Sequence, residues 1–176
     1  MIEYLKDKIA MVLVDRKLKH IKHNNLNFTN VFAKSYNFLV ILTEEEKDFH
    51  HSQQVLSFLD DNRKNSTILT RDFRVSLLPP KYRFKVIEYT IGDINKLNLP
   101  GKQLTEKLSS LQVNVVIDLN RSANLFCSYL CNLVQAEVRI GFAKESSDKF
   151  YNLQIVNNDE PAEISYKNFL NCLRMF

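Results

Sequence analysis

Four polar residues lie at the end of one hydrophobic run or just after it and form the strongest candidate site: Asp118, Asn120, Arg121 and Ser122. The run, VNVVIDL, reads as a strand. Carboxylate and amide oxygens accept hydrogen bonds from sugar hydroxyls, and a guanidinium binds a phosphate or a carboxylate. A structural alternative uses the same residues, with Asn120 or Ser122 capping the next helix and Asp118 accepting bonds from neighbouring donors or pairing with Arg121. The sequence leaves both interpretations open.

A second candidate cluster, residues 43–52, is strongly acidic. It reads TEEEKDFHHS, with four carboxylates against one lysine. Asp48 is a candidate general base, that is, a proton acceptor. The titratable residues His50 and His51 lie close to it in the same loop. The negative charge of this cluster repels a phosphate ligand. In addition, phosphate cradles use the backbone N–H groups of glycine-rich turns, and this segment contains no glycine. The structural alternative is a helix beginning near Asp48 or Phe49, whose positive end favours carboxylates.

The elements that must position these loops alternate between two patterns from residue 37 onward. Short runs rich in β-branched residues are the expected strands: 38–42, 67–70, 85–89, 114–119, 138–142 and 151–156. Apolar residues at helical spacing give the expected helices: 50–61, 104–111, 122–136 and 162–176. This alternation is typical of βαβ units. We therefore predict an α/β fold, a Rossmann-like three-layer domain with a mostly parallel, doubly wound sheet.

The run at 114–119 has hydrophobic side chains at consecutive positions, as expected of a strand covered on both faces at the centre of such a sheet. In open α/β sheets, ligands bind beyond the carboxyl ends of the strands, where the winding direction reverses. Residues 43–52 and 118–122 each follow a predicted strand. We therefore expect these two polar loops to be neighbours in space and to line one crevice.

The first segment, residues 2–23, is expected to form a basic amphipathic helix. Six basic residues outnumber three acidic ones there, which accounts for most of the formal net charge of +4. Such a helix packs on its own domain or contacts an anionic membrane surface or a partner. Asparagines at 24–30 indicate a linker. The predicted organisation is a helix with its linker at 1–33 and a single domain at 34–176.

Composition excludes several function classes. The 176 residues contain three glycines, too few for a glycine-rich phosphate loop, and 45% hydrophobic residues, enough for the core of one domain. Charge nearly cancels outside the first segment, so we expect no nucleic-acid partner. The sequence shows neither a secretory leader pattern nor an apolar run of membrane-spanning length, so the expected compartment is the cytoplasm.

Thiols and imidazoles are poorly spaced for a metal site. Cys127, Cys131 and Cys172 lie in apolar helical stretches without CxxC spacing and are expected to be buried free thiols. His20 and His23 lack a further ligand at suitable spacing and are expected at the surface. We predict no metal and no cofactor.

Residues 37–155 resemble the family 9 glycosyltransferases, the ADP-heptose:lipopolysaccharide heptosyltransferases. The resemblance is carried by VNVVIDLNRSANLFCSYLCNLVQAEVRIGF, in which I-D-L is followed by an apolar helix and then by R-I-G-F, residues 139–142. In KDFHHSQQVL, Asp48 and Leu56 keep the spacing of the family's G-D-x-x-x-x-x-P-x-L motif. Lys47 and Gln54 replace its glycine and proline.

The resemblance implies a relative of the acceptor-side domain of a two-domain enzyme, with Asp48 at the position of the proposed general base. The donor-binding domain is absent from this sequence. We therefore expect a degenerate, non-catalytic binding or interaction module in a bacterial cytoplasm, contacting an anionic saccharide or a protein. Residues 1–23 would offer peripheral contact with the inner membrane. The residues expected to contact the ligand are His50, His51, Asp118, Asn120, Arg121 and Ser122.

The alternative is a working glycosyltransferase component of cell-envelope polysaccharide synthesis, completed by a partner chain or a second copy. In that case Asp48 is the base, and Asp118, Asn120 and Arg121 contact the acceptor.

Overall fold

The structure, a computed structural model, describes residues 2–18, 30–157 and 160–175. Within these residues, parallel strands form one sheet of six in the order β3-β2-β1-β4-β5-β6. The strands are β1 (Asn37–Ile41), β2 (Asn65–Arg71), β3 (Val86–Tyr89), β4 (Val115–Asp118), β5 (Val138–Phe142) and β6 (Leu153–Ile155). The predicted α/β class with a parallel, doubly wound sheet is confirmed. The winding reverses between β1 and β4, which pair directly.

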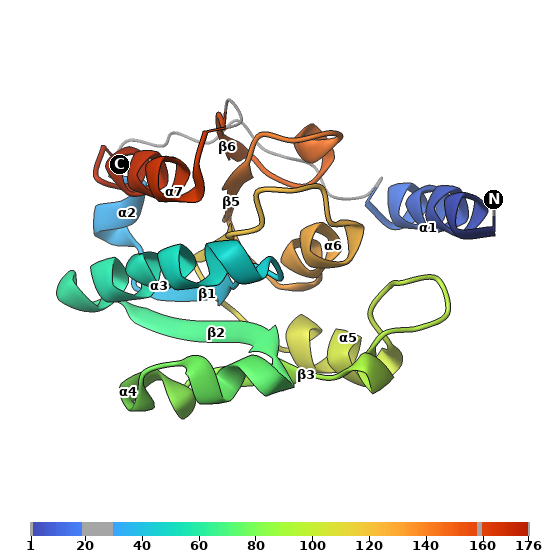
Figure 1. The fold of residues 1–176 in the computed structure, drawn as a ribbon, viewed down its shortest axis with the longest axis horizontal. Helices are drawn as coiled ribbons and strands as arrows, with labels where there is room; N and C mark the ends of the chain where they lie inside the picture. Colours follow the sequence, from blue (N-terminus) through green and yellow to red (C-terminus); the bar gives the residue numbers. More distant parts are fainter. Residues whose placement is uncertain (1, 19–29, 158–159, 176) are drawn as a thin grey trace.

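Helices cover both faces of the sheet (Figure 1). One face carries α2 (Val31–Lys34), α3 (Glu46–Asp61), α4 (Pro80–Arg83) and α7 (Ala162–Leu173). The other face carries α1 (Ile2–Leu18), α5 (Lys102–Ser109) and α6 (Leu125–Leu133). Short 3-10 turns are η1 (Asp72–Leu77), η2 (Ile91–Asp93) and η3 (Ser147–Lys149). The result is a three-layer domain with α1 outermost, beside α6.

Two hydrophobic cores follow from the alternation of side chains along the central strands. Val40 and Ile117 point to the α3 and α7 layer, whereas Leu39 and Val116 point to the α5 and α6 layer. All four side chains are fully buried. Each such side chain contributes about 1.5–3 kcal/mol by leaving water. Burial on both faces explains why β1 and β4 are hydrophobic at consecutive positions.

The predicted strands match those observed to within two residues at each end, but several helix boundaries differ. Helix α3 begins at Glu46 rather than near residue 50, and α6 spans only Leu125–Leu133 instead of 122–136. Helix α4 is not among the expected helices; Pro80 occupies its first position, where a missing N–H costs nothing. The end of the predicted first helix, with His20 and His23, and linker residues 24–29 lie outside the described residues.

The cysteines divide into two groups. Cys127 and Cys131 are fully buried in α6, as predicted, whereas Cys172 is only partly buried, so the prediction of a buried thiol there is wrong. Burial raises the pKa of the Cys127 and Cys131 thiols well above the usual range. Across the described part of the chain, no helix combines the length and the apolar character needed to cross a membrane.

Candidate functional site

The two polar loops predicted from the sequence lie side by side at the carboxyl edge of the sheet. Ile41 of β1 is paired with Asp118 of β4, and the loops continue from these residues. The Leu119 amide donates to the Ile41 carbonyl at 3.0 Å, and the Glu44 amide donates to Asn120 Oδ1 at 2.9 Å. The strand order therefore brings residues 43–52 and 118–122 together at the winding reversal.

Asp48 and Arg121 form a buried, two-point ion pair. Arg121 Nε lies 2.7 Å from Asp48 Oδ2, and its Nη2 lies 3.1 Å from Oδ1. Asp48 is 1% exposed. The hydrogen bond from Arg121 to this carboxylate raises the pKa of the guanidinium. Arg121 Nη1 also donates to the Glu160 carbonyl and to Ser165 Oγ. The pair therefore joins the start of α3 to the start of α7, and both oxygens of the predicted base accept hydrogen bonds from one guanidinium.

Asp118 is fully buried in a separate network. Its Oδ2 accepts hydrogen bonds from Lys144 Nζ at 3.0 Å and from the Tyr151 hydroxyl. Its Oδ1 accepts from the backbone and side-chain nitrogens of Asn120 at 3.0 and 2.6 Å. Burial, reinforced by Asp118, raises the pKa of the Tyr151 hydroxyl. Asp118 thus pairs with Lys144. The structural alternative in which Asp118 pairs with Arg121 is wrong.

The other predicted residues lie apart from these two networks. His50 is exposed on α3, and Ser122 is exposed in the loop before α6. The His51 ring stacks on Tyr166 of α7, with centroids 6.5 Å apart.

Helix α6 is capped one residue before its first turn. The cap is Asn124, whose Oδ1 accepts from the Cys127 amide at 3.0 Å. The alternative that Asn120 or Ser122 caps this helix is therefore wrong. Likewise α3 begins at Glu46 without a side-chain cap, two residues before Asp48.

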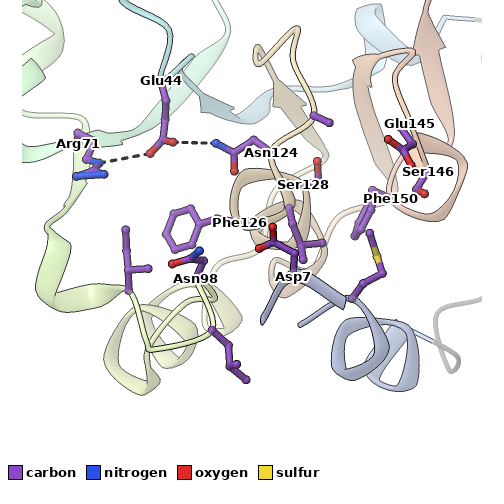
Figure 2. A pocket seen from close by; sticks show the side chains of 15 residues that line it. Asp7, Glu44, Arg71, Asn98, Asn124, Phe126, Ser128, Glu145, Ser146 and Phe150 are labelled. Atoms are coloured by element: carbon purple, nitrogen blue, oxygen red, sulfur yellow. Dashed lines mark hydrogen bonds and ion pairs between the residues drawn. The ribbon is translucent and has the colours of Figure 1, made fainter. Parts of the chain in front are cut away.

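A cavity of about 510 Å³ opens at the same edge, on the side of the sheet covered by α1, α5 and α6. It lies between α1, the loop after η2 and the start of α6 (Figure 2). None of the seven site residues predicted from the sequence lines it. Its charged and amide-bearing lining residues are Asp7, Glu44, Arg71, Asn98, Asn124 and Glu145. Phe126 and Phe150 form an apolar part of the cavity wall.

Glu44 is the most constrained carboxylate of this cavity. Its Oε1 accepts hydrogen bonds from the Tyr89 hydroxyl at 2.7 Å and from Arg71 Nε at 3.4 Å. Its Oε2 accepts from Asn124 Nδ2 at 2.8 Å, as Figure 2 shows. Burial raises the pKa of the Tyr89 hydroxyl, and Glu44 adds to the shift. Donors from β2, β3 and the cap of α6 therefore fix one carboxylate at the cavity wall.

The cavity is acidic. Among the described residues that line it, Asp7, Glu44 and Glu145 face a single guanidinium, that of Arg71, which is already paired with Glu44. Asp7 and Glu145 are exposed to solvent. Carboxylates accept hydrogen bonds from hydroxyl and ammonium groups, and they repel phosphate and carboxylate groups. The arrangement is suited to a neutral or cationic ligand rich in hydrogen-bond donors.

The R-I-G-F residues have local structural roles. Arg139 donates to the Cys131 and Val134 carbonyls at 3.0 and 3.1 Å, so it binds the carboxyl end of α6. A Cβ added to Gly141 would lie 2.8 Å from ring atoms of Tyr151. The hydrogen bonds of Arg139 and the close packing at Gly141 explain why these two residue types are present.

The cavity residues were not singled out by the sequence, although two signals point to them. Arg71 and Tyr89 end β2 and β3, so they reach the carboxyl edge of the sheet with the two polar loops. Asn124 immediately precedes the apolar run of α6, the usual place for a cap. Glu44 belongs to the acidic cluster, but only its tertiary contacts distinguish it from Glu45 and Glu46.

Within residues 2–18, 30–157 and 160–175, no group of three or more His, Cys, Asp or Glu side chains is arranged to hold a metal ion. Comparisons of the chain with protein-family models, with curated proteins and with solved structures find no match. Any assignment of function therefore rests on the fold and on the geometry of the carboxyl edge.

Proposed function

We propose that this chain is a non-catalytic binding module, a single-domain relative of the acceptor-side domain of family 9 glycosyltransferases. Its ligand is a neutral or amino-bearing saccharide, held in the acidic cavity at the carboxyl edge of the sheet. The observation that carries the proposal is the fixed Glu44 carboxylate, which Tyr89, Arg71 and Asn124 hold at the winding reversal of the sheet.

The size and lining of the cavity support a small polar ligand. Its volume of about 510 Å³ lies within the range of roughly 300–1,000 Å³ common for small-molecule sites. Carboxylate and amide oxygens match the many hydroxyl donors of a sugar, and Phe126 and Phe150 supply apolar surface for its C–H groups. The acidic lining favours neutral and amino sugars over the anionic saccharide expected from the sequence.

The pairing of the polar groups supports binding without catalysis. A general base must be within hydrogen-bond reach of the proton that it removes. Both oxygens of Asp48 accept from Arg121, and the side chain is 1% exposed. Asp118 is equally enclosed by Lys144 and Tyr151.

Isothermal titration calorimetry on the full chain tests the proposal. Glucosamine is expected to bind more tightly than glucose, and a hexose phosphate is expected to bind least, because the carboxylates attract the ammonium and repel the phosphate. Glu44→Gln is expected to weaken binding at least about tenfold, since a hydrogen bond to a charged group contributes about 1.5–3 kcal/mol. Circular dichroism of the variant verifies that it folds.

Glu163→Gln is the matched control, because Glu163 is exposed on α7, across the sheet from the cavity. An absence of saturable binding to any of the three sugars, or equal loss in the control, would overturn the proposal. Turnover of a nucleotide-sugar that is lost in Asp48→Asn would instead support the transferase alternative.

A further inference from the structure

Helix α1 has two apolar faces. Ala10 and Val14 are 1% and 0% exposed and pack toward α6. The opposite side exposes four aliphatic residues, with exposed fractions of 37–59%: Leu5, Ile9, Val12 and Leu13. At about 100° per residue, these four fall within one arc of roughly 100°. We call this set the outer face of α1. Helix α1 lies at the margin of the molecule (Figure 1).

Basic residues flank and interrupt the outer face. By helical spacing, Lys6 and Lys8 lie on its two sides, and Arg16 lies among its aliphatic residues. All three are exposed. The carboxylates of Asp7 and Asp15 are directed elsewhere, since Asp7 lines the cavity and Asp15 pairs with Lys149 at 3.0 Å. The outer face therefore combines aliphatic surface with positive charge.

This combination matches an anionic bilayer surface. A helix that lies in the interface buries its apolar side at the boundary of headgroups and acyl chains, while lysines and arginines extend to lipid phosphates. Juxtaposed basic residues are attracted by the negative surface potential of anionic lipids. A second copy of α1 fits less well, because pairing two outer faces would bring their basic residues together. Four partly exposed aliphatic side chains also fall short of the roughly 800 Å² that each partner buries in a stable interface.

We propose that α1 docks the protein on anionic membranes through its outer face. The inner face of the helix stays packed on α6, so docking requires no unfolding of the domain. Because Asp7 lies on the same helix and lines the cavity, docking would hold the cavity close to the membrane surface. The inference does not depend on what the cavity binds.

Co-sedimentation of the full chain with vesicles tests this docking. Vesicles of equal parts phosphatidylcholine and phosphatidylserine are expected to bind at least about tenfold more tightly than phosphatidylcholine alone, because several basic residues contact the anionic surface. Binding is expected to weaken as salt screens the attraction. The double variant Ile9→Asp, Val12→Asp is expected to lose binding at least tenfold, whereas Arg16→Gln loses part of it.

Leu77→Asp is the matched control, because Leu77 is an exposed aliphatic residue, 61% exposed, on η1. It is expected to sediment like the unmodified chain. Circular dichroism and thermal melting are expected to give the same fold for every variant, since the substituted side chains are exposed. Failure to sediment with phosphatidylserine vesicles, or equal loss in Leu77→Asp, would overturn the proposal. So would a lipid-free dimer that the double variant abolishes, since it would assign the outer face to a second copy.

Discussion

Asp48 and Arg121 illustrate how pairing changes the meaning of a reactive-looking residue. Each is polar and lies near the carboxyl edge of the sheet, as expected of a site, yet their side chains are 1% and 13% exposed and neutralise each other. Removing one partner of a buried pair leaves the other charge uncompensated, which costs more than the pair gains by forming. The Asp48–Arg121 pair is therefore expected to affect the stability of the fold.

Asp48→Asn is expected to lower the free energy of unfolding by about 3 kcal/mol, because it leaves the Arg121 guanidinium without a countercharge. Urea denaturation measures the change. Glu106→Gln is the control, since its ion pair with Lys102 is exposed, and it is expected to change stability by less than about 0.5 kcal/mol. Equal effects of the two substitutions would show that the buried pair has no special role.

Gly141 is required by packing rather than by backbone conformation. Its φ is not positive, but a Cβ would lie 2.8 Å from the Tyr151 ring. Gly141→Ala is expected to lower the free energy of unfolding by about 1–3 kcal/mol through overpacking. Gly92→Ala, where the nearest atom to the added Cβ would be 3.4 Å away, serves as the control in the same urea experiment. A neutral Gly141→Ala would contradict the packing explanation of R-I-G-F.

At the scale of elements, Asn124 performs two functions at the start of α6. Its Oδ1 caps the helix, and its Nδ2 donates to Glu44 in the cavity. Cap and cavity wall are therefore coupled through one side chain.

Asn124→Ser keeps a capping hydroxyl but lacks the amide that reaches Glu44, whereas Asn124→Ala loses both. Thermal or urea unfolding is expected to show Asn124→Ala less stable than Asn124→Ser by about 1 kcal/mol, the usual value of a cap. Both variants are expected to weaken binding in the cavity. Equal stabilities of the two variants would argue against the capping role.

Strands were easier to predict from the sequence than helix boundaries, for a physical reason. β1 and β4 are hydrophobic at consecutive positions because both of their faces are covered. The start of α6 was misplaced because 120–124 offers several residues that can cap a helix, and only the fold selects Asn124. Helix α4 was missed because tertiary contacts support so short an element, among them the 2% exposed Tyr82 packed in the core.

In the whole molecule, the strand order determines which loops meet at the candidate site. Because β1 and β4 are adjacent, loops more than 70 residues apart in sequence share one edge, as in the bond from the Glu44 amide to Asn120. The neighbourhood of the two loops could be predicted from the sequence by this topology alone.

The cavity itself could not be predicted from the sequence. The partners of Glu44 lie 45 residues away at Tyr89 and 80 residues away at Asn124, and a wall of the cavity comes from α1. No local pattern encodes such contacts. The acidic loop was therefore recognised as a cluster, but Glu44 was not separated from its neighbours, and none of the predicted site residues lines the cavity.

A two-dimensional amide NMR titration with glucosamine tests most directly whether the ligand site is this cavity. If the ligand binds in the cavity, the saturable shift changes are expected to be centred on Glu44, Asn124 and Phe126, with little change along α7. Changes centred on Asp48, Arg121 and the start of α7, or no saturable changes at all, would contradict this assignment.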